Sequence, residues 1–130
     1  HAIDIATGAL KTVTRRDGPD SHPAVSPDGR RIAYLGFDDR RVSHQNHRLY
    51  VMDADCGHVR DLTGDHDLDF EQPTWSADGK HLYVAYDQRG VRKLGRVSLD
   101  GSLDEIASPL GASDVGRPYT GGGFSASRNG

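Results

Sequence analysis

One short motif occurs twice in this chain, and the spacing of its copies constrains the fold more than any other feature of the sequence. The sequence Pro-Ala-Val-Ser-Pro-Asp-Gly-Arg at residues 23–30 recurs 50 residues later as Pro-Thr-Trp-Ser-Ala-Asp-Gly-Lys at residues 73–80. A weaker third copy, Phe-Ser-Ala-Ser-Arg-Asn-Gly, occupies residues 124–130. Internal repetition with such a period indicates an array of stacked units, such as a solenoid or a propeller.

A second motif repeats with the same period between the copies of the first. Residues 3–14 match residues 52–63, and residues 97–106 form a shorter third version. The central glycines of the first two versions, Gly8 and Gly57, lie 49 residues apart. Two interleaved motifs that keep one period indicate that the chain is built from copies of one supersecondary unit.

Each motif predicts a tight turn between two strands. The sequence Ser-Pro-Asp-Gly at residues 26–29 fits a type I turn, because Pro presets φ at its second position and Gly relieves crowding at its fourth. Apolar and β-branched runs flank this turn at residues 24–25 and 32–35. The second motif places another turn at residues 55–57 between two further such runs. One period therefore predicts a four-stranded antiparallel meander, with strands A to D, which is one blade of a β-propeller.

The predicted fold is all-β: a β-propeller fragment of two complete four-stranded antiparallel blades with partial blades on either side. Residues 1–14 are expected to form the C and D strands of a preceding blade, and residues 15–64 the first complete blade. Residues 65–108 are expected to form the second complete blade, and residues 109–130 a connection and the first strand of a following blade. A lone A strand would expose unpaired edges, so we expect this chain to be a piece of a longer polypeptide.

Composition excludes several classes of partner. The net charge of −3, from 16 basic and 19 acidic residues, gives no electrostatic footprint for nucleic acid or for an anionic membrane. No stretch approaches the roughly 20 apolar residues that a membrane-spanning helix needs. Cys56 is the single cysteine, which excludes an internal disulfide and leaves a cytoplasmic and a periplasmic location both open.

The repeat resembles that of a known group of propellers. The pattern Pro-x-Trp-Ser-x-Asp-Gly-Lys, with Leu-Tyr-Val-x-Asp and Leu-Thr in the second motif, is similar to the propeller repeat of TolB and of the prolyl oligopeptidase family of serine peptidases. Residues 22–63 carry this resemblance most strongly. The sequence Arg-Pro-Tyr at residues 117–119, followed by residues 121–127, resembles a stretch of acylaminoacyl-peptidase-like and dipeptidyl-peptidase-like members.

The resemblance implies a function for the longer polypeptide. In such peptidases an α/β-hydrolase domain follows the propeller and supplies the catalytic Ser, Asp and His. This chain would be the non-catalytic propeller portion, which gates or docks peptide substrates for that downstream domain. The parent would then be a serine peptidase, while the chain itself would have no activity. The alternative is a TolB-like propeller that acts as a protein–protein interaction module without any enzymatic activity.

No catalytic residue, cofactor or metal ligand is predicted in this chain. The nearest string to the Gly-x-Ser-x-Gly nucleophile elbow is Gly-Phe-Ser-Ala-Ser at residues 123–127. It has Ser in place of the second Gly and lies at a β–β position, so Ser125 is not expected to be a nucleophile. Cys56 occupies a turn with no base in sequence reach and is expected to be an ordinary turn residue.

Two acidic or histidine-rich segments suggest metal sites but fit them poorly. The run Asp-His-Asp-Leu-Asp-Phe-Glu at residues 65–71 lacks the Gly and Glu of a calcium loop, so a solvated acidic loop joining two blades is expected. His44 and His47 lie in a loop without a third zinc ligand nearby, which favours a surface loop.

Two other features have plain structural explanations. Asp28 and Asp78 are expected to accept hydrogen bonds within their own turns rather than to form a carboxylate pair. Trp75 is expected to pack between neighbouring blades.

A meander places its long connections at one end, where binding is predicted. The A–B and C–D turns are short, whereas the B–C and D–A connections at residues 38–47, 64–71 and 108–123 are longer and more variable. Variable loops on a rigid scaffold are common binding sites, and Arg and Tyr are favoured contact residues. The predicted binding residues are Arg117, Tyr119, Asp69 and His47. The predicted partners are the downstream hydrolase domain, peptide substrates and, because two blades cannot close a ring, copies of the chain itself.

Overall fold

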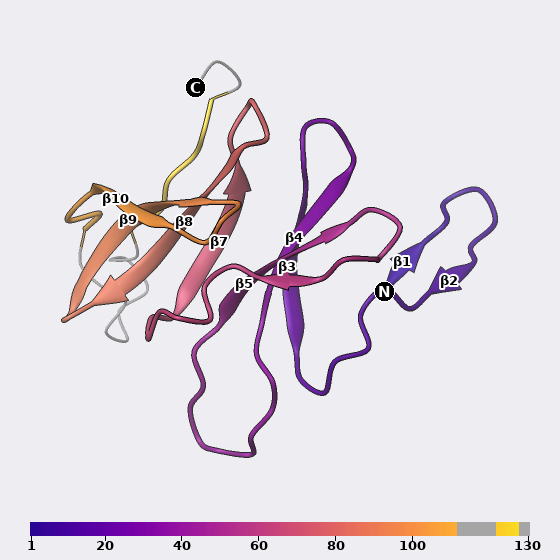
Figure 1. The fold of residues 1–130 in the computed structure, drawn as a ribbon, viewed down its shortest axis with the longest axis horizontal. Coiled ribbons are helices and arrows are strands. Elements are labelled where there is room, and N and C mark those ends of the chain that lie inside the picture. Colours follow the sequence, from indigo (N-terminus) through magenta and orange to yellow (C-terminus); the bar gives the residue numbers. More distant parts are fainter. Residues whose placement is uncertain (112–121, 128–130) are drawn as a thin grey trace.

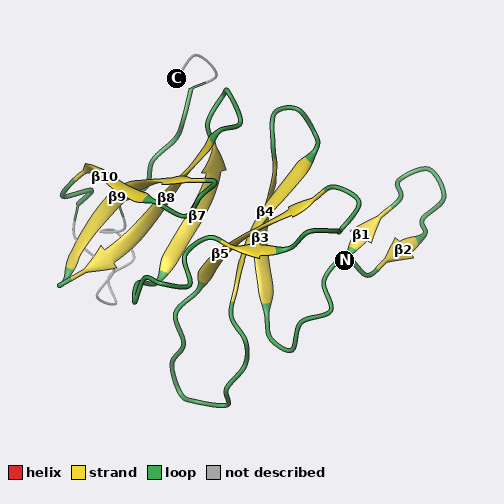
Figure 2. Cartoon of the chain, in the orientation of Figure 1, coloured by secondary structure: helices red, strands yellow, loops and turns green. Residues whose placement is uncertain are grey.

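The computed structural model describes residues 1–111 and 122–127, and in these residues it contains strands and no helix (Figure 2). Accordingly, no helix suited to crossing a membrane occurs in this described part of the chain. The strands are β1 (Ala2–Ile3), β2 (Leu10–Lys11), β3 (Asp20–Val25), β4 (Arg31–Gly36), β5 (Arg48–Asp53), β6 (Arg60–Asp61), β7 (Phe70–Trp75), β8 (His81–Gln88), β9 (Val91–Ser98) and β10 (Leu103–Ala107).

The strands form two antiparallel meanders and one hairpin (Figure 1). The first meander, here called blade 1, has the order β3-β4-β5-β6, and the second, blade 2, has the order β7-β8-β9-β10. The hairpin pairs β1 with β2. Neighbours in the sheet are also neighbours in the sequence, which is the topology of a propeller blade. The predicted all-β fold with two complete four-stranded blades is therefore confirmed.

The repeated Asp-Gly turns have the same geometry in both blades. The Asp28 carboxylate accepts hydrogen bonds from the Ser26 hydroxyl at 2.6 Å and the Arg30 amide at 3.0 Å, and Asp78 accepts the equivalent two bonds in blade 2. The glycines that follow have φ of +71° and +68°, a conformation in which other residues are strained. The expectation that each Asp caps its own turn is confirmed.

The first strand of each blade, β3 and β7, is here called its inner strand. Both inner strands carry an irregularity that the sequence did not reveal. The register of β3 on β4 shifts between Ser21 and Ala24, and that of β7 on β8 shifts at the equivalent place. The residues within these bulges, His22 and Gln72, have φ of +50° and +53°, and each is exposed and precedes a proline. A β-bulge bends its strand and re-aims side chains, so each blade turns one polar side chain outward at the same position.

The main hydrophobic core lies between the two blades. Its buried members come from both sheets: Ala33, Leu35, Leu49, Val51 and Leu62 from blade 1 and its exit, and Phe70, Trp75, Leu82, Val84, Tyr86 and Val97 from blade 2. The Trp75 indole N–H donates across the junction to the Ala24 carbonyl at 2.9 Å. The expectation that Trp75 packs between blades is confirmed.

The other face of blade 1 carries a smaller aromatic cluster of Tyr34, Tyr50 and Met52. The two tyrosine rings stack with centroids 5.3 Å apart, and the Arg16 guanidinium lies 4.0 Å from the centre of the Tyr50 ring. Arg16 also pairs with Asp20. Burial is the largest cause that raises the pKa of Tyr34, to about 12. This face therefore combines aromatic rings with hydroxyl groups and a charged guanidinium, whereas the face that meets blade 2 carries the main hydrophobic core.

Two predicted strands differ from the structure. The fourth strand of blade 1 is only two residues long; just beyond it the Leu62 amide donates to the Leu49 carbonyl at 2.9 Å, and the Thr63 hydroxyl accepts from the Leu49 amide at 2.8 Å. The A strand expected from residue 124 is not formed in residues 122–127, where no strand of the described chain pairs with them.

Candidate functional site

The two ends of the blades differ in the length of their connections. The Asp-Gly turns between β3 and β4 and between β7 and β8 lie at one end, at the top of Figure 1. At the other end, residues 37–47 connect β4 to β5 and residues 62–69 connect β6 to β7. The equivalent B–C connection in blade 2 is only the two-residue turn at 89–90. The long connections therefore gather at one end of the pair of sheets.

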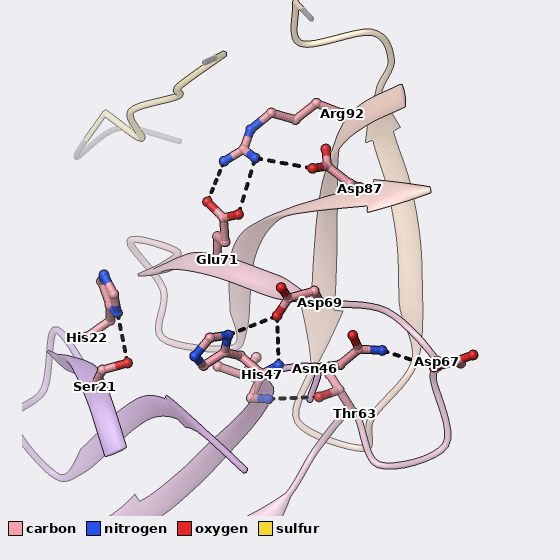
Figure 3. A network of polar contacts seen from close by, with 11 residues as sticks. Ser21, His22, Asn46, His47, Thr63, Asp67, Asp69, Glu71, Asp87 and Arg92 are labelled. Atoms are coloured by element: carbon pink, nitrogen blue, oxygen red, sulfur yellow. Dashed lines mark hydrogen bonds and ion pairs between the residues drawn. The ribbon is translucent and has the colours of Figure 1, made fainter. Parts of the chain in front are cut away.

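The structure brings together two residues that the sequence predicted as separate contacts. His47 ends the 37–47 loop and Asp69 ends the linker before β7 (Figure 3). An Asp69 carboxylate oxygen accepts from the His47 amide at 2.7 Å and lies 2.9 Å from the ring Nδ1. The Phe70 amide donates in return to the His47 carbonyl at 3.1 Å. This cluster fastens blade 1 to blade 2 at the end with the long connections.

The acidic run at residues 65–71 is not a purely solvated loop, which corrects the expectation from sequence. The Asn46 amide donates to the Asp67 carboxylate at 2.9 Å, next to the bond between His47 and Asp69. Two carboxylates of the run are thus used to hold the 37–47 loop. Within residues 1–111 and 122–127, no group of three His, Cys, Asp or Glu side chains is placed to hold a metal ion.

A second clamp, missed by the sequence reasoning, lies on the other side of β7. The Arg92 side chain is only 6% exposed and donates to both oxygens of Glu71, at 2.7 and 3.4 Å (Figure 3). It also lies 3.8 Å from Asp87 and donates to the Gly122 carbonyl at 2.9 Å. A two-pronged arginine–carboxylate pair fixes orientation as well as distance.

Arg92 and His47 occupy the same position in their blades. Gly36 pairs with Arg48 in blade 1, and Tyr86, 50 residues later, pairs with Lys93 in blade 2. The residue just before each of these partners is His47 or Arg92. The period of 50 residues does not reveal this equivalence, because the shorter B–C turn of blade 2 puts Arg92 only 45 residues after His47; the strand register is needed to see it.

Between the two clamps lies a hollow of about 300 Å³. Its lining includes His22 from β3 together with Gln72, Glu71, Asp69 and His47. His22 and Gln72 are the bulge residues and are exposed, which leaves hydrogen-bonding groups of both inner strands open to a ligand. Carboxylate, amide and imidazole groups can bind the backbone N–H and C=O groups of an extended peptide.

The remaining predicted residues fall elsewhere. Arg117 and Tyr119 lie outside the described residues. Ser125 lies in a segment that the structure describes without strand or helix. Cys56 is a turn residue with φ of +78°, and its sulfur is 4.0 Å from the Ala54 carbonyl oxygen.

The fold and the site define a segment of a β-propeller whose blades are joined at a polar, loop-bearing end. The chain belongs to the family described as "Lipoprotein LpqB beta-propeller domain", whose profile matches residues 7–117.

Solved structures place the chain among TolB-like propellers. A TolB-type protein from Agrobacterium tumefaciens superposes with a TM-score of 0.63 at 28% identity, over 77% of this chain and 34% of that one. A puromycin hydrolase superposes with a TM-score of 0.55 at 30% identity, over 66% of this chain and 14% of that one.

Curated relatives carry a peptidase name. The "Probable dipeptidyl-peptidase 5" of Arthroderma benhamiae is 29% identical over 85 residues, which is 65% of this chain and 12% of that protein. The "Dipeptidyl-peptidase 5" of Arthroderma otae is 28% identical over 95 residues, or 72% of this chain and 13% of that protein. The chain thus spans about an eighth of these relatives, and the resemblance to TolB and to prolyl oligopeptidase-family propellers is confirmed.

Proposed function

We propose that this chain is the non-catalytic propeller part of a serine peptidase of the prolyl oligopeptidase family. It would gate or dock peptide substrates for an α/β-hydrolase domain of the same polypeptide. The observation that supports this most is the hollow between the inner strands, which has both polar and apolar lining residues and lies at the end that carries the long connections. The names of the curated relatives and of the puromycin hydrolase point to the same class.

The geometry suits guidance rather than chemistry. The pairs of His47 with Asp69 and of Arg92 with Glu71 fix the chain at the start of β7, next to the hollow. The exposed bulge residues, His22 and Gln72, could then bind a passing peptide without losing a structural role. A rigid scaffold with polar groups at its mouth selects substrates by size and hydrogen bonding.

The test uses the longer polypeptide that carries this chain. Its sequence is expected to contain a Gly-x-Ser-x-Gly elbow followed by Asp and His. The His47→Ala variant removes one clamp and is expected to raise kcat/KM for long peptides relative to a short chromogenic substrate. The purified 130-residue chain is expected to hydrolyse neither substrate.

The matched control is His58→Ala. His58 also pairs with an aspartate, at 2.7 Å from Asp53, but it lies at the opposite end of blade 1 next to the 55–57 turn. If His47→Ala and His58→Ala leave the ratio of long-peptide to short-substrate hydrolysis equally unchanged, the gating role is wrong.

A second candidate is a TolB-like interaction module without an attached enzyme. It is favoured by the higher TM-score with the TolB-type protein than with the puromycin hydrolase and by the lipoprotein propeller family itself. A longer polypeptide that contains only further blades and no nucleophile elbow would select this function over the first.

We also propose that the chain on its own associates with copies of itself. Ile3, Ile5 and Leu10 of the first hairpin and its turn are 63%, 98% and 68% exposed. Apolar side chains exposed to this degree on a two-stranded hairpin favour pairing with another chain. Light scattering should show a mass above 14.1 kDa that falls on dilution. A monomer at high concentration would contradict this proposal.

A further inference from the structure

The 37–47 loop encloses a second pocket, of about 400 Å³, beside the hollow between the inner strands. Its lining comes from this loop, from Arg48 at the start of β5 and from His66 and Asp67 of the linker before β7. None of these residues lines the hollow that holds Glu71. A volume of this size is in the range that holds small ligands or the end of a peptide.

The loop is held in shape by its own hydrogen bonds. The Asp39 carboxylate accepts from the Arg41 amide at 2.7 Å and from the Gln45 side chain at 3.3 Å. The Gln45 carbonyl in turn accepts from the Arg40 amide at 2.9 Å, and the Asp39 amide donates to the Asp17 carbonyl at 2.9 Å. A pocket wall that is ordered before binding does not add the entropic cost of ordering it.

Three charged groups that line this pocket already have partners. The pairs are Arg48 with Asp61 at 3.1 Å, Asp38 with Arg16 at 3.6 Å, and Asp67 with the Asn46 amide at 2.9 Å. These contacts leave little positive charge available from Arg48 and little negative charge from Asp38. Asp67, however, binds Asn46 through one carboxylate oxygen only, so its other oxygen can accept a further N–H.

Three other side chains of the lining are uncommitted. Arg40, His44 and His66 form no side-chain hydrogen bond or ion pair with the residues that the structure describes, although His66 packs edge-on against Phe70. A guanidinium group matches the two oxygens of a carboxylate, and imidazole N–H groups can donate to the same oxygens. These groups are thus suited to a carboxylate ligand.

The pocket also has an apolar side. Phe37 and Val42 line it together with the polar groups, and Val42 is 57% exposed. Exposed apolar side chains beside uncommitted donors fit a ligand that has an apolar side chain next to a carboxylate.

We propose that this pocket binds the C-terminal end of a peptide. Arg40 and His44 would hold the terminal carboxylate, Asp67 would accept the N–H of the last residue, and its apolar side chain would pack on Phe37 and Val42. This deepens the proposed function in one respect, since it takes a peptide as the ligand, but it needs no hydrolase domain and no chemical step.

The experiment measures binding to the 130-residue chain by isothermal titration. The probes are acetyl-Ala-Leu with a free carboxylate, the same peptide as its C-terminal amide, and inorganic phosphate. The free acid is expected to bind at least about tenfold more tightly than the amide, because the amide loses the charge-assisted bonds. Phosphate, which has no N–H or apolar group, is expected to bind more weakly than the acid.

The variants compare two neighbouring arginines. Arg40→Gln is expected to weaken binding of the free acid at least about tenfold, while Arg41→Gln, which does not alter a lining residue, leaves it unchanged. Val42→Asp is a second variant that places a negative charge beside the carboxylate and should also weaken binding of the free acid at least about tenfold. Circular dichroism identifies any variant that does not fold.

Several results would overturn the proposal: equal binding of acid and amide, an unchanged affinity in both Arg40→Gln and Val42→Asp, or phosphate binding as tightly as the acid. The last result would mean a general anion site. The titration measures no hydrolysis, so a negative result would rule out the C-terminal peptide site but not the gating role tested by His47→Ala. Conversely, an unchanged hydrolysis ratio in His47→Ala would rule out the gating role but not the peptide site.

Discussion

Blade 1 and blade 2 share one scaffold and differ most in one connection. Both have the Asp-Gly turn with the same hydrogen bonds, and both have a bulged inner strand with one residue at positive φ. Their B–C connections differ, with 11 residues in blade 1 and 2 in blade 2, where Arg89 and Gly90 make a tight turn. The shared features set the sheets, whereas the long loop supplies the polar groups at the loop-bearing end. The features that repeat thus determine the fold, and the loop at residues 37–47, which does not repeat, forms the candidate binding region.

The largest expected effect tests whether the junction between the blades depends more on β7 than on the equivalent strand of blade 1, β3. Trp75 and Val25 occupy equivalent positions, but Trp75 is 7% exposed and Val25 is 62% exposed. Trp75→Ala is expected to lower the free energy of unfolding by about 3 to 5 kcal/mol, because it empties the junction core and removes the bond to Ala24. Val25→Ala should change it by less than about 0.5 kcal/mol. Urea unfolding followed by circular dichroism measures both, and similar losses would contradict the junction described.

The next effect compares the two clamps on β7. Glu71→Gln removes the negative charge that faces the Arg92 guanidinium, which is 6% exposed, and is expected to cost about 2 kcal/mol. Asp69→Asn, beside the more exposed His47, should cost about 1 kcal/mol or less. Glu105→Gln, which breaks the surface pair with Lys93, is the control and should cost the least. If the Asp69 variant loses the most stability, the pair of Arg92 with Glu71 is not the stronger of the two clamps.

A smaller effect tests whether the two Asp-Gly turns are equivalent. Gly29→Ala and Gly79→Ala are each expected to cost about 1 kcal/mol, because both glycines have positive φ. No close atom opposes a Cβ at either site, so the cost comes from the backbone alone. Gly123→Ala, at ordinary φ and with open space around it, is the control and should be neutral. Unequal costs at the two turns, measured by thermal unfolding, would argue against one shared scaffold.

The smallest effect concerns the pH dependence of the same turns. The hydroxyl bonds from Ser26 and Ser76, followed by backbone amide bonds, hold the pKa values of Asp28 and Asp78 below the ordinary value. A lowered pKa adds stability that is complete above the unfolded value of 3.8 and is lost as the pH falls through the lower folded value. Titration of the carboxyl carbons by NMR should therefore show both groups shifted downward.

The matched variants for this measurement are Ser26→Ala and Ser76→Ala. Each should return the pKa of its own aspartate toward the ordinary value and leave the other one in place, because the two turns lie in different blades. A variant that moves both pKa values, or neither, would be inconsistent with local hydrogen bonding as the cause.

The parts of the fold that could be predicted are those that depend on neighbouring residues. The turn at residues 26–29 needs only Pro, Asp and Gly at fixed places, so its copy at residues 76–79 identified both blades. The packing of Trp75 between the blades could be predicted in the same way, because stacked blades bury side chains of their strands against the neighbouring blade.

The contacts that could not be predicted depend on the path of a loop or on the register of the strands. The pair of His47 and Asp69 depends on how the linker before β7 turns back on the 37–47 loop, and no local pattern specifies that path. The pair of Arg92 and Glu71 was hidden for a different reason. Both residues lie in blade 2, and only the register of β7, β8 and β9 brings them close together. The bulges at His22 and Gln72 left no signal because both residues can adopt ordinary strand conformations.

Those two bulges also bear on how the protein resists aggregation. The strands β3 and β7 are outermost in their sheets, and Pro23 and Pro73 follow the bulged residues within them. A foreign strand that tried to extend either sheet would meet a missing N–H and a break in the hydrogen-bonding register. The edges of the sheets formed by β3 and β7 are thereby protected from amyloid-like growth, even though the hollow between these strands is open to a passing peptide.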